Sequence, residues 1–173
     1  CETHSARKRS KDMKQIVRRI ALIVLGLVLI GHALIHLGII PGGMQGSDGR
    51  TGWSGQSWLL DHFLNASAIW AIGIVLVVGT ILFYVTGGLG ALGVPFLKRR
   101  WKATTIVASL LSLLLFAVTW AGILPHPTDA IWGPVISGVL LVGLLTDLFL
   151  EHTILRPKVR HVEHKGIAVH TSK

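Results

Sequence analysis

The sequence predicts an all-α integral membrane protein, with four transmembrane helices arranged as an antiparallel bundle. Charged residues make up only 14% of the 173 residues, whereas a soluble domain carries about 25%. The few charges are bunched, so that long apolar stretches without charge lie between them. A helix of about 20 apolar residues is long enough to cross the ~30 Å hydrocarbon core of a bilayer.

The first two spans follow a basic segment, residues 1–19. The uncharged run IALIVLGLVLIGHALIHLGIIP predicts the first span at about residues 20–40. The next uncharged stretch, residues 63–97, is too long for one crossing, and its glycine-rich end at residues 87–95 is expected to break the helix. The second span is therefore predicted at about residues 64–86.

The third and fourth spans are separated by a short loop that contains two prolines. The third span is predicted at about residues 103–124, where Pro125 and Pro127 close it. Asp129 is suited to cap the N-terminus of the next helix, so the fourth span is predicted at about residues 130–150.

The positions of lysine and arginine predict the orientation of the spans. All but one of the 17 lie in the N-terminal segment, in the loop between the second and third spans, or in a basic tail, residues 156–173. That tail follows the four-helix transmembrane domain, residues 20–155. The exception is Arg50, in the first loop on the opposite side. The positive-inside rule therefore predicts a multi-pass protein of the cytoplasmic membrane with both termini in the cytoplasm.

The net charge of +9 fits a membrane surface better than a nucleic acid. Basic clusters beside membrane spans set topology and attract anionic lipids, so no nucleic-acid partner is expected. The expected partners are the lipid bilayer and either other membrane subunits or further copies of this chain. Cys1 is the only cysteine, which excludes an internal disulfide or a CxxC redox pair.

Two histidines, His32 and His36, lie inside the first predicted span. At a spacing of four residues both imidazoles project from the same face of the helix. Ionisable side chains at membrane depth are expensive, and they usually face a protein interior, a partner or a wet cavity. This pair is therefore the first candidate for chemistry.

Two further histidines are predicted at the same outer end of the bundle, His62 in the first loop and His126 in the second, near Asp61 and Asp129. Imidazole and carboxylate groups are good ligands for zinc, copper or iron, and an i,i+4 histidine pair supplies two ligands from one helix. The candidate metal ligands are His32, His36, His62 and His126.

Three interpretations of the histidine pair stay open at this point. The first is structural packing, with interhelical hydrogen bonds from the imidazoles. The second is ligation of a transition metal or a haem; a haem would need its second ligand from elsewhere, because one helix cannot supply both faces. The third is proton or quinone chemistry. Asp147, near the cytoplasmic end of the fourth span, fits either a proton path or an ion pair with Arg18, Arg19 or Lys102.

The segment VLGLVLIGHALIHLGIIPGG, an apolar first span with a histidine near its end and a glycine-rich loop after it, resembles the start of DoxX-like four-helix membrane proteins. His32 matches the family's histidine, whereas His36 stands where a lysine is common. The resemblance implies four spans and cytoplasmic termini. It also implies a relation to subunits of membrane oxidoreductases that act with quinones.

These observations predict a small polytopic membrane subunit or accessory protein of a redox or energy-converting complex, without enzymatic activity as an isolated chain. The alternative is a metal- or haem-binding membrane protein, such as an oxidoreductase, that uses His32 and His36. A small transporter or channel is a second alternative, disfavoured because the spans offer few polar residues to line a path.

Overall fold

The computed structural model describes residues 2–39, 52–124 and 126–154. Within these residues, four helices are long and apolar enough to cross a membrane. They are α1 (Glu2–Ile35), α2 (Ala66–Ala91), α3 (Trp101–Thr119) and α4 (Trp132–Ile154).

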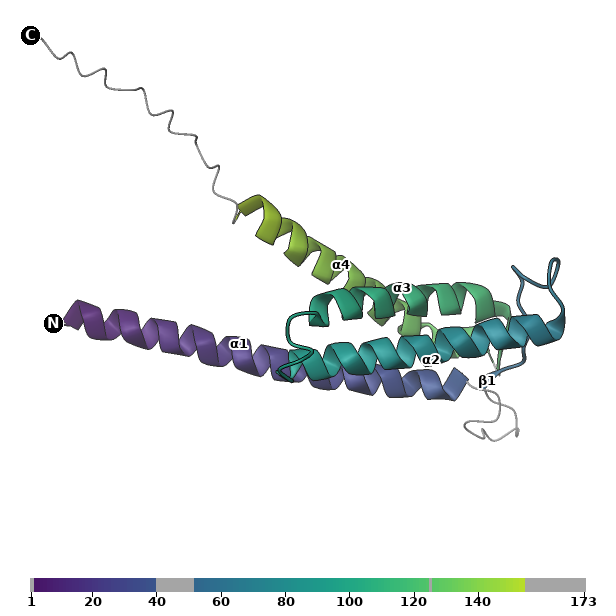
Figure 1. The fold of residues 1–173 in the computed structure, drawn as a ribbon, viewed down its shortest axis with the longest axis horizontal. Helices are drawn as coiled ribbons and strands as arrows, with labels where there is room; N and C mark the ends of the chain where they lie inside the picture. Colours follow the sequence, from purple (N-terminus) through teal and green to yellow (C-terminus); the bar gives the residue numbers. More distant parts are fainter. Residues whose placement is uncertain (1, 40–51, 125, 155–173) are drawn as a thin grey trace, which may run out of the picture.

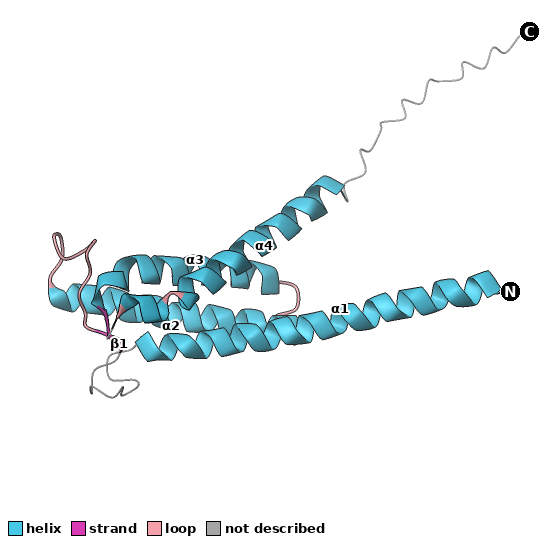
Figure 2. Ribbon diagram, turned by 180° about the vertical axis from the view of Figure 1, so that it is seen from behind, coloured by secondary structure: helices cyan, strands magenta, loops and turns pink. Residues whose placement is uncertain are grey.

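Successive helices run in alternating directions, as Figure 1 shows. α1 packs on α2, α2 on α3, and α3 on α4. Towards its C-terminal end α4 diverges from the other helices, and α1 extends well beyond them at the same end (Figures 1 and 2). α1 and α4 are thus the two outer helices of the series.

Short elements close the opposite end of the helices. Single 3₁₀ turns follow α1 and α3 and precede α4, and two short strands pair antiparallel, Gly52 with Leu124 and Trp53 with Ile123. These elements are η1 (His36–Ile39), β1 (Gly52–Trp53), η2 (Trp120–Gly122), β2 (Ile123–Leu124) and η3 (Pro127–Ala130). The pairing of β1 with β2 fixes the middle of the first loop, which connects η1 to α2, beside the turn between α3 and α4.

α1 is one continuous helix through the basic segment into the apolar run, and it tightens to a 3₁₀ turn at His36. In a 3₁₀ turn each amide bonds to the carbonyl three residues back instead of four. Nδ1 of the His36 ring donates a hydrogen bond to the carbonyl of His32 at 3.0 Å. This bond ties the His36 side chain back onto the last turn of α1.

α2 continues to Ala91, past the end predicted at Thr86. The glycines there do not break the helix, because they serve close packing. A Cβ at Gly88 would lie 2.8 Å from the carbonyl oxygen of Gly26, so the backbones of α1 and α2 touch at this point. The chain leaves the helix before Gly93, whose φ of 99° suits glycine. The helix ends where a left-handed residue is needed.

α4 begins at Trp132, slightly later than predicted. Asp129 lies within η3, and the residue that precedes α4 is Ile131. The N-cap of α2 is Asn65, whose Oδ1 accepts a hydrogen bond from the amide of Ala68 at 2.9 Å.

The described part of the first loop is anchored by two tryptophans. Trp53 is 2% exposed and packs against α2 where Gly73 leaves room for its ring. Trp58 is 58% exposed, and its Nε1 donates to the carbonyl of Ala117 on α3 at 2.7 Å. The first half of the loop, including Arg50, lies outside the described residues.

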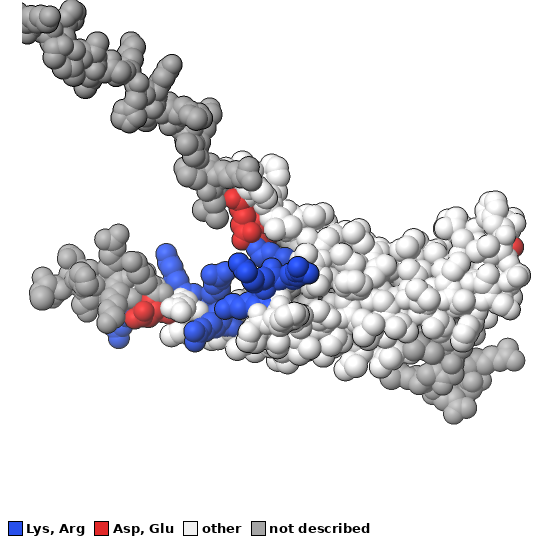
Figure 3. Space-filling view, in the orientation of Figure 1, with Lys and Arg blue, Asp and Glu red and all other residues white. Residues whose placement is uncertain are grey.

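Lysine and arginine side chains gather at one end of the molecule, around α1 and the loop between α2 and α3, as Figure 3 shows. The apolar length of the helices is free of charge in this view. At the charged end Nζ of Lys102 lies 2.7 Å from a carboxylate oxygen of Asp147 and 2.7 Å from one of Glu151. Asp147 is therefore in an ion pair that joins α3 to α4.

Candidate functional site: a buried histidine–serine network

The two histidines of the first span face the interior of the helix assembly. His32 is 3% exposed and His36 is 1% exposed. Their rings lie edge to face, with centroids 4.8 Å apart. Because residues four apart share one face of a helix, both rings meet the same opposing surface, which α3 and α4 supply.

Two serines connect the imidazoles. Nε2 of His36 lies 2.9 Å from Oγ of Ser112 on α3, and Nε2 of His32 lies 3.1 Å from Oγ of Ser137 on α4. The two serine oxygens are 2.7 Å apart, and both serines are fully buried. With the bond from His36 to the carbonyl of His32, the four residues form a closed ring of hydrogen bonds.

Tyr84 on α2 joins this ring as a branch. Its hydroxyl lies 3.0 Å from Oγ of Ser137 and 3.2 Å from Oγ of Ser109, and its side chain is fully buried. The ring of Tyr84 also packs edge to face on His32, with centroids 4.9 Å apart. All four helices therefore contribute a polar side chain to one buried network.

Proton counting fixes the direction of these bonds for neutral imidazoles. A carbonyl can only accept, so Nδ1 of His36 carries the proton and Nε2 of His36 accepts from Ser112. Ser112 donates its single proton to His36. In the 2.7 Å contact between the two serine oxygens, Ser137 is therefore the donor and Ser112 the acceptor. Ser137 in turn accepts from Nε2 of His32.

The same count leaves Nδ1 of His32 as a bare acceptor. This nitrogen is buried and has no hydrogen-bond partner; among the described residues the only other such side-chain atom is Oγ1 of Thr80. A buried polar atom without a partner carries a penalty of about 1–3 kcal/mol, and such an atom calls for an explanation.

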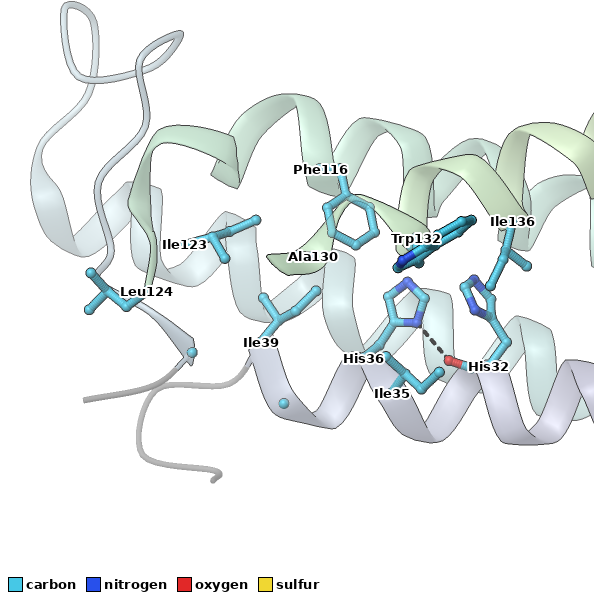
Figure 4. Close-up of a pocket in the computed structure, with 13 residues that line it drawn as sticks. His32, Ile35, His36, Ile39, Phe116, Ile123, Leu124, Ala130, Trp132 and Ile136 are labelled. Atoms are coloured by element: carbon cyan, nitrogen blue, oxygen red, sulfur yellow. Dashed lines mark hydrogen bonds between the residues drawn. The ribbon is translucent and has the colours of Figure 1, made fainter. Parts of the chain in front are cut away.

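A cavity of about 350 Å³ adjoins the histidines (Figure 4). It lies between α1 with η1 on one side and α3, η3 and α4 on the other, and both strands contribute to its end. His32 and His36 form its polar wall, and the remaining wall is apolar, with Phe116, Trp132 and Ile136 as examples. Pockets that bind small molecules have this composition, with many apolar groups and few polar ones.

The other predicted metal ligands lie elsewhere. His62 and His126 are exposed and do not line the cavity. In the part of the chain that the structure describes, no group of three or more His, Cys, Asp or Glu side chains is placed to hold a metal ion. Within the described residues the four histidines are therefore not gathered at one point, since His32 and His36 are buried whereas His62 and His126 are exposed.

Sequence reasoning missed the serines and the tyrosine. A signal exists on α3, where the buried residues Thr105, Ser109 and Ser112 follow one another at intervals of four and three. This spacing places all three on one face of a helix. A polar stripe of this kind inside an apolar span indicates a buried network.

No protein-family model, no curated protein and no solved structure matches this chain.

Proposed function

We propose that the four helices insert into the cytoplasmic membrane as an antiparallel bundle, with both termini in the cytoplasm. The apolar helices of alternating direction support this arrangement, and so does the gathering of cations at one end (Figure 3). Reporter fusions after Lys14, Gly49, Arg99 and Lys165 test it. Only the fusion after Gly49 is expected outside, and a cytoplasmic signal there would overturn the topology.

We propose further that the chain is a small subunit or accessory protein of a redox or energy-converting membrane complex, and that its buried network holds a proton. The observation that carries this proposal is the continuous chain of hydrogen bonds from His32 through Ser137 and Ser112 to His36. Such polar groups within a membrane span are costly, and proton relays are one of their established uses.

The bond directions allow a proton to enter and be stored. A proton that binds Nδ1 of His32 lets Nε2 pass its own proton to Ser137. Ser137 then passes one to Ser112, and Ser112 passes one to Nε2 of His36. Every oxygen keeps one proton at the end, and the positive charge has moved from His32 to His36. The ring closes on the carbonyl of His32, so the network has one entry and no separate exit.

A network with one entry favours a subunit that exchanges protons with a partner reaction over a channel. The test is purification of the full chain from its native membrane in a mild detergent, followed by native electrophoresis. We expect migration as a large assembly that contains a redox-active partner. Migration as this chain alone, in every detergent that preserves other complexes, would overturn the proposal.

One observation favours a second function, the binding of a metal or haem. Nδ1 of His32 is buried without a hydrogen-bond partner, whereas both nitrogens of His36 are engaged. The chain would then supply one nitrogen, and the other ligands would come from a partner. Metal analysis and an absorption spectrum of the purified chain separate the two functions. A stoichiometric metal that disappears in the double variant His32→Leu, His36→Leu would favour this one.

A further inference from the structure

We propose that the charged end of the helix assembly binds the headgroup of one anionic phospholipid between Arg18 and Arg19 on α1 and the cations of the loop between α2 and α3. The cations of this loop are Lys98, Arg99 and Arg100, and all five side chains are exposed. The position of this end at the cytoplasmic surface of a bilayer rests on the proposed function. The proposal adds a partner of stated chemistry and the side chains that hold it.

α1 is one continuous helix, so its two faces extend past the end of the other helices (Figures 1 and 2). Arg18 lies about three turns before Leu29 on the same face, and Leu29 is fully buried against the other helices. Arg19 lies about two turns before Gly26, where a Cβ would be 2.7 Å from the side chain of Leu92. Both arginines are therefore on the side of α1 that faces the other helices.

The loop between α2 and α3 begins at this contact with α1. Leu92 follows the last residue of α2, and Lys98, Arg99 and Arg100 directly precede the first residue of α3. Figure 3 shows the lysine and arginine side chains around α1 and this loop gathered at one end of the molecule. The arginines of α1 and the cations of the loop thus belong to one surface.

The protein does not balance the charge of this surface. Within the described part of the chain, the only salt bridges join Lys102 to Asp147 and Glu151. Asp12, the acidic residue nearest to Arg18 in the sequence, is exposed on α1. Neighbouring cations repel each other unless an anion lies between them. Guanidinium groups form charge-assisted, bidentate hydrogen bonds with phosphate oxygens, so a phosphate group is the anion that fits.

Apolar side chains beside these cations favour a lipid over a soluble phosphate. Phe96 in the loop is 92% exposed, and Met13, Ile16 and Val17 on α1 are each more than half exposed. At a membrane surface the phosphates adjoin the acyl chains, so a lipid covers basic and apolar groups together. A soluble phosphate would cover only the cations.

The depth of the two arginines also fits a headgroup. Arg18 and Arg19 directly precede the apolar run of α1. About 20 residues of such a run cross the ~30 Å hydrocarbon core, and the headgroups lie just outside it. The arginines are therefore placed at the level of the lipid phosphates.

The experiment counts the lipids bound to the full chain by native mass spectrometry. The chain is purified in a mild detergent and titrated with phosphatidylglycerol, which is anionic, and with phosphatidylcholine, which is zwitterionic. We expect one phosphatidylglycerol per chain to be bound most tightly and in preference to phosphatidylcholine. This affinity should fall as salt is added, because ions screen exposed charges.

Two double variants test whether α1 and the loop hold the same lipid. They are Arg18→Gln with Arg19→Gln, and Arg99→Gln with Arg100→Gln. Each should weaken the binding of this lipid about 30-fold, which corresponds to ~2 kcal/mol, because each cation near a membrane surface contributes about 1 kcal/mol. All four side chains are exposed, so the fold should be unchanged.

The matched control is Lys158→Gln with Arg160→Gln, which removes the same charge from the basic tail. It should leave the affinity for phosphatidylglycerol unchanged. Glycerol 3-phosphate, which carries a phosphate without acyl chains, separates a lipid from a soluble ligand. It should not displace the lipid at equal concentration, and displacement would assign the cations to soluble phosphates and overturn the proposal.

Three further results would overturn it: equal affinity for the two lipids, an equal loss in the tail control, or one phosphatidylglycerol that stays tightly bound in either arginine variant. The last result would show two separate sites. The reporter fusions and the native electrophoresis do not depend on these measurements, so failure here is distinguishable from failure of the proposed function.

Discussion

His36 and Ser112 lie 76 positions apart in the sequence, and Nε2 of His36 is 2.9 Å from Oγ of Ser112 in the fold. Ser112 also lies 2.7 Å from Ser137, so this one hydroxyl links α1, α3 and α4. The serine oxygen accepts one bond and donates the other. Its position between two partners makes it the residue whose loss separates the two histidines.

Ser112→Ala should destabilise the fold by about 1–3 kcal/mol, because it leaves Nε2 of His36 and the hydroxyl of Ser137 unpaired in a buried site. Unfolding of the full chain in detergent measures this loss. The control is Ser67→Ala on the exposed first turn of α2, for which a change below ~0.5 kcal/mol is expected. Equal losses for the two variants would contradict the network.

Tyr84→Phe should cost less, on the order of 0.6 kcal/mol, which is typical of single interhelical hydrogen bonds within membranes. The phenyl ring keeps its packing on His32, and Ser137 still receives the proton of His32. The ¹⁵N resonances of His36 should therefore stay in place in this variant and shift in Ser112→Ala. A shift of equal size in both would show that Tyr84 is part of the chain of bonds rather than a branch.

The sequence was sufficient to locate the four apolar helices but not their ends. An apolar stretch long enough to cross a bilayer indicates directly that the segment is buried in lipid or protein. The end of a helix depends instead on how the helix packs against other elements. Gly88 illustrates this dependence. The glycine-rich sequence around it predicts a helix break, but the helix continues because these glycines allow the backbone of α1 at Gly26 to pack closely against α2. The start of α4 at Trp132 also differs from the start predicted directly after Asp129, because a 3₁₀ turn, η3, occupies residues 127–130.

The candidate site was predictable in its histidines and not in its partners. Two imidazoles in an apolar span indicate a candidate site because ionisable groups are energetically costly within a membrane. A single serine in a helix carries little energetic cost and is common, so it indicates nothing by itself. Ser137 lies 105 positions from His32, and no local pattern connects them. Which acceptor stays unpaired, and where a cavity forms, depends on the packing of α1 against α3 and α4.

Gly73→Ala should destabilise the fold by about 1–3 kcal/mol, the typical cost of overpacking. A Cβ at this position would overlap the ring of Trp53, which is buried and held by a bond from Nε1 to the carbonyl of Gln56. Gly79→Ala, on the same helix, is the matched control. Its Cβ would meet Leu111 at an ordinary 3.5 Å, and the better helix propensity of alanine should stabilise the fold by up to ~1 kcal/mol. Near-UV circular dichroism should change in the first variant only.

Lys102→Met should be more damaging than Asp147→Asn. Lys102 contacts both Asp147 and Glu151, so the loss of one carboxylate leaves the other in place. Both acidic side chains are about half exposed, and such pairs contribute at most ~1 kcal/mol. Without Lys102 the two carboxylates, one helical turn apart on α4, repel each other.

Unfolding of the two variants at low and high salt measures this difference, which should shrink as salt screens the charges. A larger loss of stability in Asp147→Asn than in Lys102→Met would contradict the conclusion that Lys102 pairs with both carboxylates. If Asp147 instead belongs to a proton path, Asp147→Asn should stop turnover of the purified complex while its stability stays within ~1 kcal/mol of the parent. An ion pair alone predicts that turnover survives, because Lys102 keeps Glu151 as its partner and the contact between α3 and α4 remains.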